Sequence, residues 1–256
     1  MQFGICTGFE HVPILKRLGY DYLEGDLAAL SRFDAVQISR AEAGLRANGL
    51  FMEIANRFFS PEIRLCGEEA RLEKIREYTL RAFDHAVRLG LELAVLGSGA
   101  ARQRPEGCAP QKARAQLLEA LNEAGDAARQ YGVMIAVEPL NREECNQLST
   151  ISETLAFLEE LRHPNVGVAA DLYHMEMEGE PFTNLAAAGD RLFHIHFNRP
   201  AKPRSFPARQ DGYDYTAFAG ALRHSGYTGR ISIEARSENF AADADASLSL
   251  MWQLFQ

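Results

Sequence analysis

Residues 133 to 144 have the sequence VMIAVEPLNREE, in which an uncharged apolar run is followed directly by a carboxylate and a proline. The run from Val133 to Val137 has the length and composition of a parallel strand that is covered on both faces. Glu138 follows at once, and burying such a carboxylate is costly unless a cation or hydrogen-bond donors compensate it. The stretch therefore predicts a buried strand that delivers an acidic side chain to one end of a sheet.

Three later segments repeat this form. The runs VGVAAD, LFHIH and RISIE end in Asp171, His196 and Glu234, respectively. A segment long enough for a helix separates each run from the next, so the strands are expected to be parallel neighbours whose carboxyl ends share one face. We therefore expect Glu138, Asp171, His196 and Glu234 to form one site on that face.

The rest of the chain continues the alternation of strands and helices. Strands are predicted at residues 2–8, 20–23, 50–55, 93–96, 133–137, 166–171, 192–196 and 230–234, with Glu24 at the tip of the second. Helices are predicted at residues 12–18, 33–47, 68–89, 111–131, 149–161, 181–189, 215–225 and 242–255. Eight strand–helix pairs indicate an α/β protein with a single (β/α)8 TIM barrel domain over residues 1–256, whose active site lies at the C-terminal face.

Three connections are longer than a simple turn requires, namely residues 56–67, 100–110 and 198–213. Loops of about a dozen residues in a compact domain are usually functional. We expect these three to close over the site. The GSG sequence at residues 97–99 is a weak phosphate signal, but a small phosphate or hydroxyl group near Ser98 and Arg102 is an alternative.

Composition narrows the class of protein. The chain has 256 residues, of which 46% are hydrophobic and 24% charged, and its formal charge of −8 argues against a nucleic-acid partner. Its four cysteines have no C-x-x-C spacing, which favours free thiols in a reducing compartment. No secretory leader or membrane-length apolar run is recognisable, so we expect a cytoplasmic protein without a membrane partner.

Three carboxylates and one imidazole suit one divalent metal ion with hard or borderline ligand preferences. Mn²⁺ is the first expectation, with Mg²⁺, Co²⁺ or Zn²⁺ as alternatives. Four protein ligands leave coordination positions open, which is typical of catalytic metal sites rather than structural ones. The alternative is a set of four polar core residues that satisfy one another.

Other polar residues near the strand ends are candidates for contacts with a ligand. His194 and His196 point to the same face of a strand, and His194 lies deeper, so we expect His194 to pack or to support His196. His174 is predicted in the loop that follows the strand ending in Asp171, above the metal. Glu144 is close enough in sequence to Glu138 to reach over the same cavity, with Glu143 as its solvent-facing rival.

The segments EPLNREE, HPNVGVAADLYHM, HIHFN and GYTGRISIEAR resemble the xylose-isomerase-like sugar isomerase and epimerase family, which includes ketose 3-epimerases and hydroxypyruvate isomerases. The resemblance extends over nearly the whole chain. It implies that Glu138, Asp171, His196 and Glu234 bind one divalent metal and that the two glutamates exchange a proton with the carbon next to the substrate carbonyl. It also implies that Glu144 and His174 hold substrate oxygens.

An arginine follows the metal histidine in ketose epimerases, and here the loop departs from that pattern. Arg199, Arg204 and Arg209 are the candidates, and Arg204 fits best because RSFP at residues 204–207 looks like the R-x-x-P step of the family. The altered loop leaves the identity of the sugar open. The resemblance thus indicates the reaction class more closely than the substrate.

Together these features predict a metal-dependent isomerase or epimerase of a small ketose or related hydroxy-carbonyl compound, acting through an enediolate. The alternatives are a keto-polyol dehydratase at the same site, a metal-dependent abasic-site endonuclease and a sugar-binding module without catalysis. The endonuclease would need more metal ligands and a basic groove, which the charge of −8 disfavours. A homo-oligomer is possible.

Overall fold

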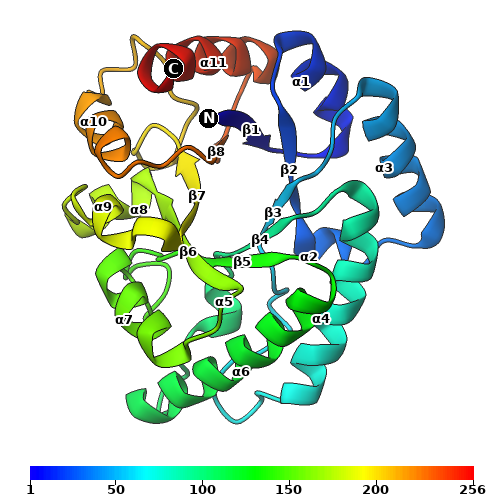
Figure 1. Cartoon of the computed structure of the whole chain (residues 1–256), viewed down its shortest axis with the longest axis vertical. Coiled ribbons are helices and arrows are strands. Elements are labelled where there is room, and N and C mark those ends of the chain that lie inside the picture. Colours follow the sequence, from blue (N-terminus) through cyan, green and yellow to red (C-terminus); the bar gives the residue numbers. More distant parts are fainter.

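The computed structural model describes all 256 residues and consists of a closed barrel of eight parallel strands inside a ring of helices (Figure 1). The strands follow one another around the barrel in sequence order, and β1 closes it by pairing with β8. They are β1 (Gln2–Cys6), β2 (Tyr22–Asp26), β3 (Ile54–Asn56), β4 (Leu93–Leu96), β5 (Met134–Val137), β6 (Val166–Asp171), β7 (Leu192–Phe197) and β8 (Arg230–Ile233). The predicted (β/α)8 TIM barrel is confirmed.

The connections between strands are helical. The α-helices are α1 (Val12–Leu18), α2 (Leu27–Leu30), α3 (Ala35–Asn48), α4 (Leu72–Ala86), α5 (Gly99–Arg102), α6 (Pro110–Gln130), α7 (Ile151–Leu161), α8 (Leu172–Glu178), α9 (Asn184–Ala188), α10 (Thr216–His224) and α11 (Phe240–Phe255). Short 3-10 segments are η1 (Phe9–His11), η2 (Val87–Leu89) and η3 (Gly189–Arg191). Local sequence sets several of these boundaries, as at α7, where the Thr150 side chain accepts a hydrogen bond from the Glu153 amide.

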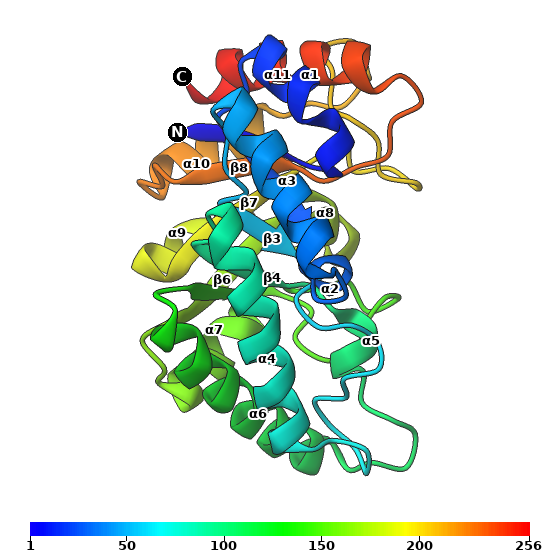
Figure 2. The same ribbon diagram turned by 90° about the vertical axis from the view of Figure 1, so that its right-hand side faces the viewer.

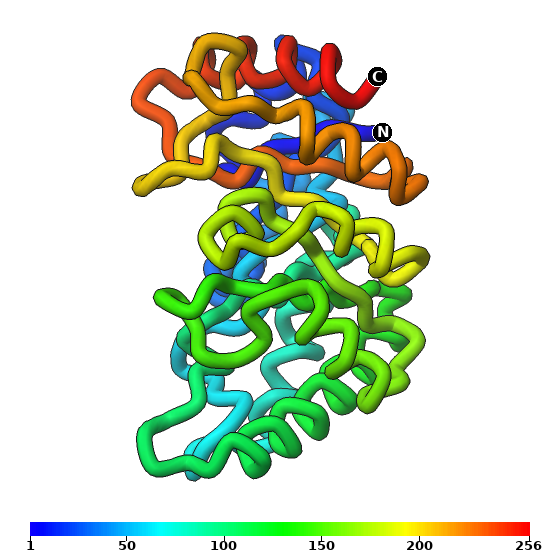
Figure 3. Tube along the Cα trace, turned by 90° about the vertical axis from the view of Figure 1, so that its left-hand side faces the viewer, coloured from blue at the N-terminus to red at the C-terminus, as the bar shows by residue number.

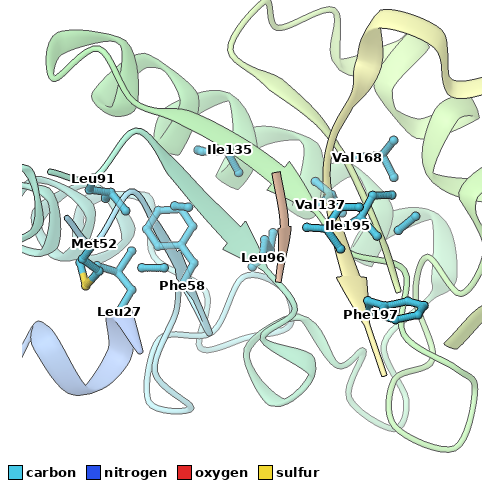
Figure 4. Packing of buried hydrophobic residues seen from close by; sticks show 14 of the residues in the cluster. Leu27, Met52, Phe58, Leu91, Leu96, Ile135, Val137, Val168, Ile195 and Phe197 are labelled. Carbon is cyan, nitrogen blue, oxygen red and sulfur yellow. The ribbon is translucent and has the colours of Figure 1, made fainter. Parts of the chain in front are cut away.

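The main hydrophobic core lies between the outer face of the barrel and the helices. Alternate residues of each strand point outward into it, among them Ile135 and Val137 of β5 and Ile195 and Phe197 of β7 (Figure 4). These side chains are fully buried. Since both faces of each strand are covered, the strands are nearly continuous apolar runs, which is why they could be recognised in the sequence.

A second, smaller cluster fills the inside of the barrel. It consists of Tyr22, Ile54, Leu93, Val95, Ala136 and Ala169. Tyr22 can occupy this space because Gly4 faces it, and a Cβ at Gly4 would lie 2.3 Å from the tyrosine ring. The Tyr22 hydroxyl shares a hydrogen bond of 2.8 Å with Ser232 Oγ. This packed layer forms a floor, so that polar side chains farther along the strands gather above it.

Two expectations about local structure are wrong in ways that matter for the site. Glu24 lies within β2 rather than at its tip, because the strand continues to Asp26. His174 lies in helix α8 rather than in a loop, since Asp171 caps a helix that begins at Leu172. The expected loop 100–110 is also interrupted by the short helix α5, which extends to Arg102.

The two ends of the chain lie side by side at one edge of the barrel, as both side views show (Figures 2 and 3). The side-chain amide of Gln256 donates to the carbonyl of Met1 over 3.0 Å. None of the helices combines the length and the apolar composition needed to cross a membrane.

Candidate active site

The four side chains expected from the strand ends come together in space. One potential ligand atom from each of Glu138, Asp171, His196 and Glu234 lies within 4.8 Å of the other three. The first three residues are buried, and the Glu234 side chain is 19% exposed. The prediction that these residues meet on one face is therefore confirmed.

The Nδ1 atom of His196 is the centre of this cluster. It lies 2.7 Å from Glu138 Oε1, 3.4 Å from Glu234 Oε2 and 3.9 Å from Asp171 Oδ2. Burial opposes a charge on the ring, but the surrounding carboxylates, Glu24 foremost, raise the pKa of His196 well above its ordinary value. Three carboxylates thus converge on one largely buried nitrogen.

Glu24 supports the cluster from below, and the sequence analysis did not identify it as a site residue. Its Oε1 atom lies 2.8 Å from His196 Nε2, and its Oε2 atom lies 2.9 Å from His194 Nε2. Burial alone would raise the pKa of Glu24, but His196 and His194 lower it overall, so the carboxylate is ionised. Glu24 therefore fixes which nitrogen of His196 faces the carboxylate cluster.

His194 has the supporting position that its depth in the strand suggested. It is fully buried, burial lowers its pKa, and the neutral ring donates from Nε2 to Glu24. Its Nδ1 atom has no hydrogen-bond partner. His194 makes no hydrogen bond to the four clustered residues and is linked to them through Glu24, which contacts both His194 and His196.

Asp171 occupies the N-cap of α8, which explains how it can be buried. Its Oδ1 atom accepts hydrogen bonds from the amides of Tyr173 and His174 at 2.6 and 3.2 Å. Asn198, directly after β7, donates from its side-chain amide to both oxygens of Asp171. Amide donors and the positive end of a helix stabilise the charged form of a carboxylate without neutralising it.

Glu138 is held from the side of β4. Burial disfavours its ionised form, yet the charge and hydrogen bond of His196 lower its pKa overall. Gly97 makes room for the carboxylate, because a Cβ there would lie 2.0 Å from Glu138 Oε2. The fully buried Arg102 donates from Nη2 to the Glu138 carbonyl over 2.6 Å. Its contact is with this backbone, and its Nε and Nη1 atoms have no partner.

Of the three candidate arginines, the structure brings Arg204 into the cluster. Its Nη1 atom lies 2.7 Å from Glu234 Oε2 and 3.0 Å from Asp171 Oδ2, and its guanidinium stands 5.1 Å from the centre of the Tyr173 ring. Arg199 pairs through its backbone with Ser205, and Arg209 is exposed. Neither forms a hydrogen bond or an ion pair with the four clustered residues.

His174 and Glu144 lie on the same side of the cluster as Arg204. His174 is buried and accepts hydrogen bonds at Nδ1 from the backbone and the side chain of Asn141, so its neutral ring carries a proton on Nε2. That Nε2 atom has no partner. Glu144 is exposed, accepts from the Asn141 side chain over 3.1 Å and lines a pocket together with Arg204 and Glu234.

Two pockets meet at Glu234. The inner pocket, about 430 Å³, is lined by Glu144, Tyr173, Pro203, Arg204, Glu234, Ala235 and Arg236. The outer pocket, about 470 Å³, lies against β1, β2 and β3 and shares Glu234 and Ala235 with the inner one. Asn56, at the end of β3, lines the outer pocket and donates to Glu234 Oε1 over 3.2 Å. Glu234 therefore stands between two spaces that a small molecule can enter.

The donor set fits a divalent ion. Carboxylate oxygens and a ring nitrogen are ligands that Mg²⁺, Mn²⁺, Co²⁺ and Zn²⁺ accept, and here they lie close enough to share one ion. His196 presents Nδ1 to the cluster while its other nitrogen contacts a buried carboxylate, the arrangement common for metal-binding histidines. The excess of buried negative charge around Nδ1 also calls for a cation.

Asn141 and Asn198 are further polar residues of the site that the sequence analysis missed. Both are buried, and both follow a barrel strand within a few residues. The rule that polar groups after buried strands share one face would have included them, had it been applied to amides as well as to charged groups. Arg102 was named only as a partner for a phosphate or hydroxyl group near Ser98, whereas in the structure it is fully buried and donates to the Glu138 carbonyl.

Comparison with known proteins agrees with this architecture. The profile of the xylose isomerase-like TIM barrel family matches residues 12–253. An L-ribulose 3-epimerase of Methylomonas sp. (strain DH-1) is 28% identical over 252 residues, which cover 93% of this chain and 81% of that protein. A ketose 3-epimerase of Arthrobacter globiformis is 27% identical over 248 residues, with the same two coverages.

Solved structures show the same fold. A D-allulose 3-epimerase from Methylomonas sp., crystallised in complex with D-allulose, superimposes with a TM-score of 0.87 at 24% sequence identity. That alignment covers the whole of this chain and 97% of the other. A D-psicose 3-epimerase crystallised in the presence of D-fructose has a TM-score of 0.85 at 20% identity. The elements that carry the clustered side chains thus have counterparts in proteins of this architecture.

Proposed function

The chain belongs to the xylose isomerase-like TIM barrel family, and from this premise we propose that it is a metal-dependent epimerase of a small ketose or related hydroxy-carbonyl sugar. At the broader level it is a sugar isomerase or epimerase, as its relatives are. The observation that carries the finer proposal is the approach of Glu138 and Glu234 to one point from β5 and from the end of β8. Two carboxylates that reach a substrate from different sides can serve as base and acid on its opposite faces.

We assign the metal to Glu138, Asp171, His196 and Glu234, with Mn²⁺ as the expected ion. When bound, a divalent ion would polarise the carbonyl of the sugar and make the neighbouring C–H more acidic. The protein residues then have to bind the sugar, orient it and move the proton.

Proton transfer falls to the two glutamates. In its ionised form, the buried carboxylate of Glu138 at the end of β5 can accept a proton from carbon. Asn56 and Arg204 each donate to one oxygen of Glu234, which fixes the orientation of that carboxylate. In epimerisation one glutamate takes the proton from one face of the carbon, and the other delivers a proton to the opposite face.

His174 and Arg204 would bind substrate oxygens on the inner side. The Nε2–H group of His174 is a buried donor without a partner, which is the condition expected of a group that awaits a ligand oxygen. Arg204 already lies between Glu234 and Asp171 and has further N–H groups to offer. Glu144, at the rim of the inner pocket, would accept from a sugar hydroxyl.

The relatives named above are epimerases, which favours inversion over the dehydratase, endonuclease and binding-module alternatives. The test is a panel of ketoses and keto-polyols incubated with the protein and Mn²⁺ in deuterated water, with product stereochemistry and deuterium position determined together. We expect an inverted carbon next to the carbonyl that carries solvent deuterium. Loss of water to a diketone would instead identify a dehydratase, and inversion without deuterium at any carbon would contradict exchange through open carboxylates.

A further inference from the structure

The outer pocket shares Glu234 with the proposed catalytic centre but extends from it on the side opposite Glu144 and Arg204, which would hold oxygens of the reacting sugar. Its wall includes Glu24 and Glu234 at the inner end and Phe9 and Phe33 farther out. Glu144 and Arg204 line the inner pocket instead. A molecule whose carbonyl lies between Glu138 and Glu234 therefore has room to extend past Glu234 toward β1, β2 and β3.

The outer pocket is by itself about as large as the inner pocket. Sites that bind small molecules usually have volumes of roughly 300–1,000 Å³. The outer pocket alone, at about 470 Å³, lies within that range, and the inner pocket adds a space of similar size. The two pockets together can hold a reacting sugar and a second group of comparable bulk attached to it.

The charge of the outer pocket limits what that second group can be. Its lining includes four carboxylates, Glu10, Glu24, Asp26 and Glu234. The one arginine in its wall, Arg57, forms an ion pair of 2.8 Å with Asp26, so its charge is already balanced. A phosphate or carboxylate would meet repulsion here. In contrast, the inner pocket contains the guanidinium groups of Arg204 and Arg236. An anionic occupant is therefore disfavoured. Because Glu24 already faces two buried histidines and Glu234 already faces Arg204, the occupant that fits is neutral rather than cationic.

The wall of the outer pocket suits a sugar ring. Phe9 and Phe33 are half-buried against the core, with ring centroids 6.1 Å apart and planes inclined by 53°, so they form a fixed apolar corner. Thr7 and Asn56 supply uncharged polar groups to the same lining. A pyranose ring has an apolar face of C–H groups and a rim of hydroxyls, which matches an aromatic wall with a few polar groups.

We infer that the outer pocket binds a neutral glycosyl group joined to the keto-sugar, so that the preferred substrate is a keto-glycoside such as a keto-disaccharide rather than a free ketohexose. The inference rests on the proposed function, since it needs proton exchange next to a carbonyl between Glu138 and Glu234. It adds that Phe9 and Phe33 determine specificity through a part of the substrate that does not react.

The test compares a disaccharide oxidised to a ketone on one ring with free D-fructose, using the rate of deuterium uptake from solvent at the carbon next to the carbonyl. In the wild-type protein with Mn²⁺, we expect kcat/KM for the keto-disaccharide to exceed that for D-fructose by about tenfold or more. Loss of one aromatic contact is worth about a factor of ten. Phe33→Ala should therefore reduce the ratio of the two kcat/KM values about tenfold, and Phe33→Leu, which keeps most of the packing, should reduce it less.

Phe51→Ala is the matched control, because Phe51 is 59% exposed and precedes β3 at the opposite end of the barrel. It should leave the ratio unchanged. Three results would each overturn the inference while leaving the proposed function in place. They are a wild-type preference for D-fructose, an equal fall in kcat/KM for both substrates in both Phe33 variants, and faster exchange when a phosphate replaces the second ring. Absence of exchange with every keto-sugar would overturn the proposed function itself.

Discussion

The two halves of the barrel contribute to the site in different ways. The half formed by β5 to β8 supplies all four side chains that converge on one point, Glu138, Asp171, His196 and Glu234. The half formed by β1 to β4 supplies none of these, but it contributes the lining of the outer pocket. One half therefore carries the residues that we assign to the metal and the substrate, while the other contributes most of the lining of the outer pocket.

The polar residues of the first half act mainly through partners in the second. Glu24 contacts His196, and Asn56 donates to Glu234. Arg102, which follows β4, donates to the carbonyl of Glu138. The difference separates residues that would touch metal or substrate from residues that position them, and substitutions on either side of this boundary should therefore differ in their effects.

The largest effect is expected from Glu234→Gln. An amide oxygen can still coordinate a metal, but it cannot accept a proton from carbon, so kcat should fall about 10³–10⁴-fold, near the upper end for loss of a general base. Metal content should change much less. Steady-state kinetics and metal analysis of the same preparation check both parts, with Glu238→Gln, an exposed glutamate in the following loop, as the control. A kcat within about threefold of the wild type would remove Glu234 from the proton transfer.

Asp171→Asn is expected to have the next largest effect, on metal affinity. Asparagine remains a good N-cap for α8 and can still interact with Asn198, so the fold should be retained. Loss of the charge should weaken Mn²⁺ binding by more than about 100-fold, which is the most that loss of an outer-sphere partner usually costs. Titration calorimetry with Mn²⁺ measures this, and the exposed Asp190→Asn variant is the control. Binding at the wild-type affinity would show that Asp171 is not a ligand.

Glu24→Gln tests the first half of the barrel directly. The amide can still accept from His196 Nε2, but it no longer offers a negative charge beneath the ring. Mn²⁺ affinity should fall about 10- to 100-fold, less than in Asp171→Asn. The same titration serves here, with Glu73→Gln on the exposed side of α4 as the control. A loss equal to or greater than that of Asp171→Asn would erase the boundary between ligands and positioning residues.

The sequence predicted the four clustered residues of β5 to β8 far better than the residues of β1 to β4 that contact them. Asp171 and His196 were recognised because each ends an apolar run, and a charged group at that position stands out against its neighbours. The same feature identified the (β/α)8 fold, since strands covered on both faces are nearly continuous apolar runs. Burial on two sides thus makes both the strands and their polar ends visible in sequence.

Glu24 was misplaced for a physical reason. Followed by Gly25, it resembled the exposed end of a short strand, yet it points into the barrel, where His194 and His196 face it from β7. Only closure of the barrel brings β2 opposite β7, and no local sequence pattern indicates that residues so far apart in the sequence are in contact. His174 was placed in a loop because the capping role of Asp171 at α8 was not recognised.

The smallest effect is expected from Lys202→Met. This variant tests whether the burial of a residue or the half of the barrel in which it lies determines how much its substitution reduces stability and activity. Lys202 Nζ lies 2.5 Å from Glu143 Oε2. This ion pair joins the loop after β7 to the loop after β5, in the half of the barrel formed by β5 to β8. The two side chains are 52% and 67% exposed, whereas those of Arg204 and Glu234 are 24% and 19% exposed. Exposed ion pairs commonly contribute nothing measurable, because solvent screens the charges and two flexible side chains must be ordered.

The midpoint of urea unfolding and kcat/KM should therefore both match the wild type within error in Lys202→Met, in Glu143→Gln and in the double variant. Because the pair is solvent-exposed, raising the salt concentration should not separate these proteins either. A different result would be a clear loss of kcat/KM in either single variant, with no further loss in the double variant. It would show that the pair holds the two loops in place over the inner pocket. In that case, whether a residue is essential would depend on the half of the barrel to which it belongs rather than on its burial.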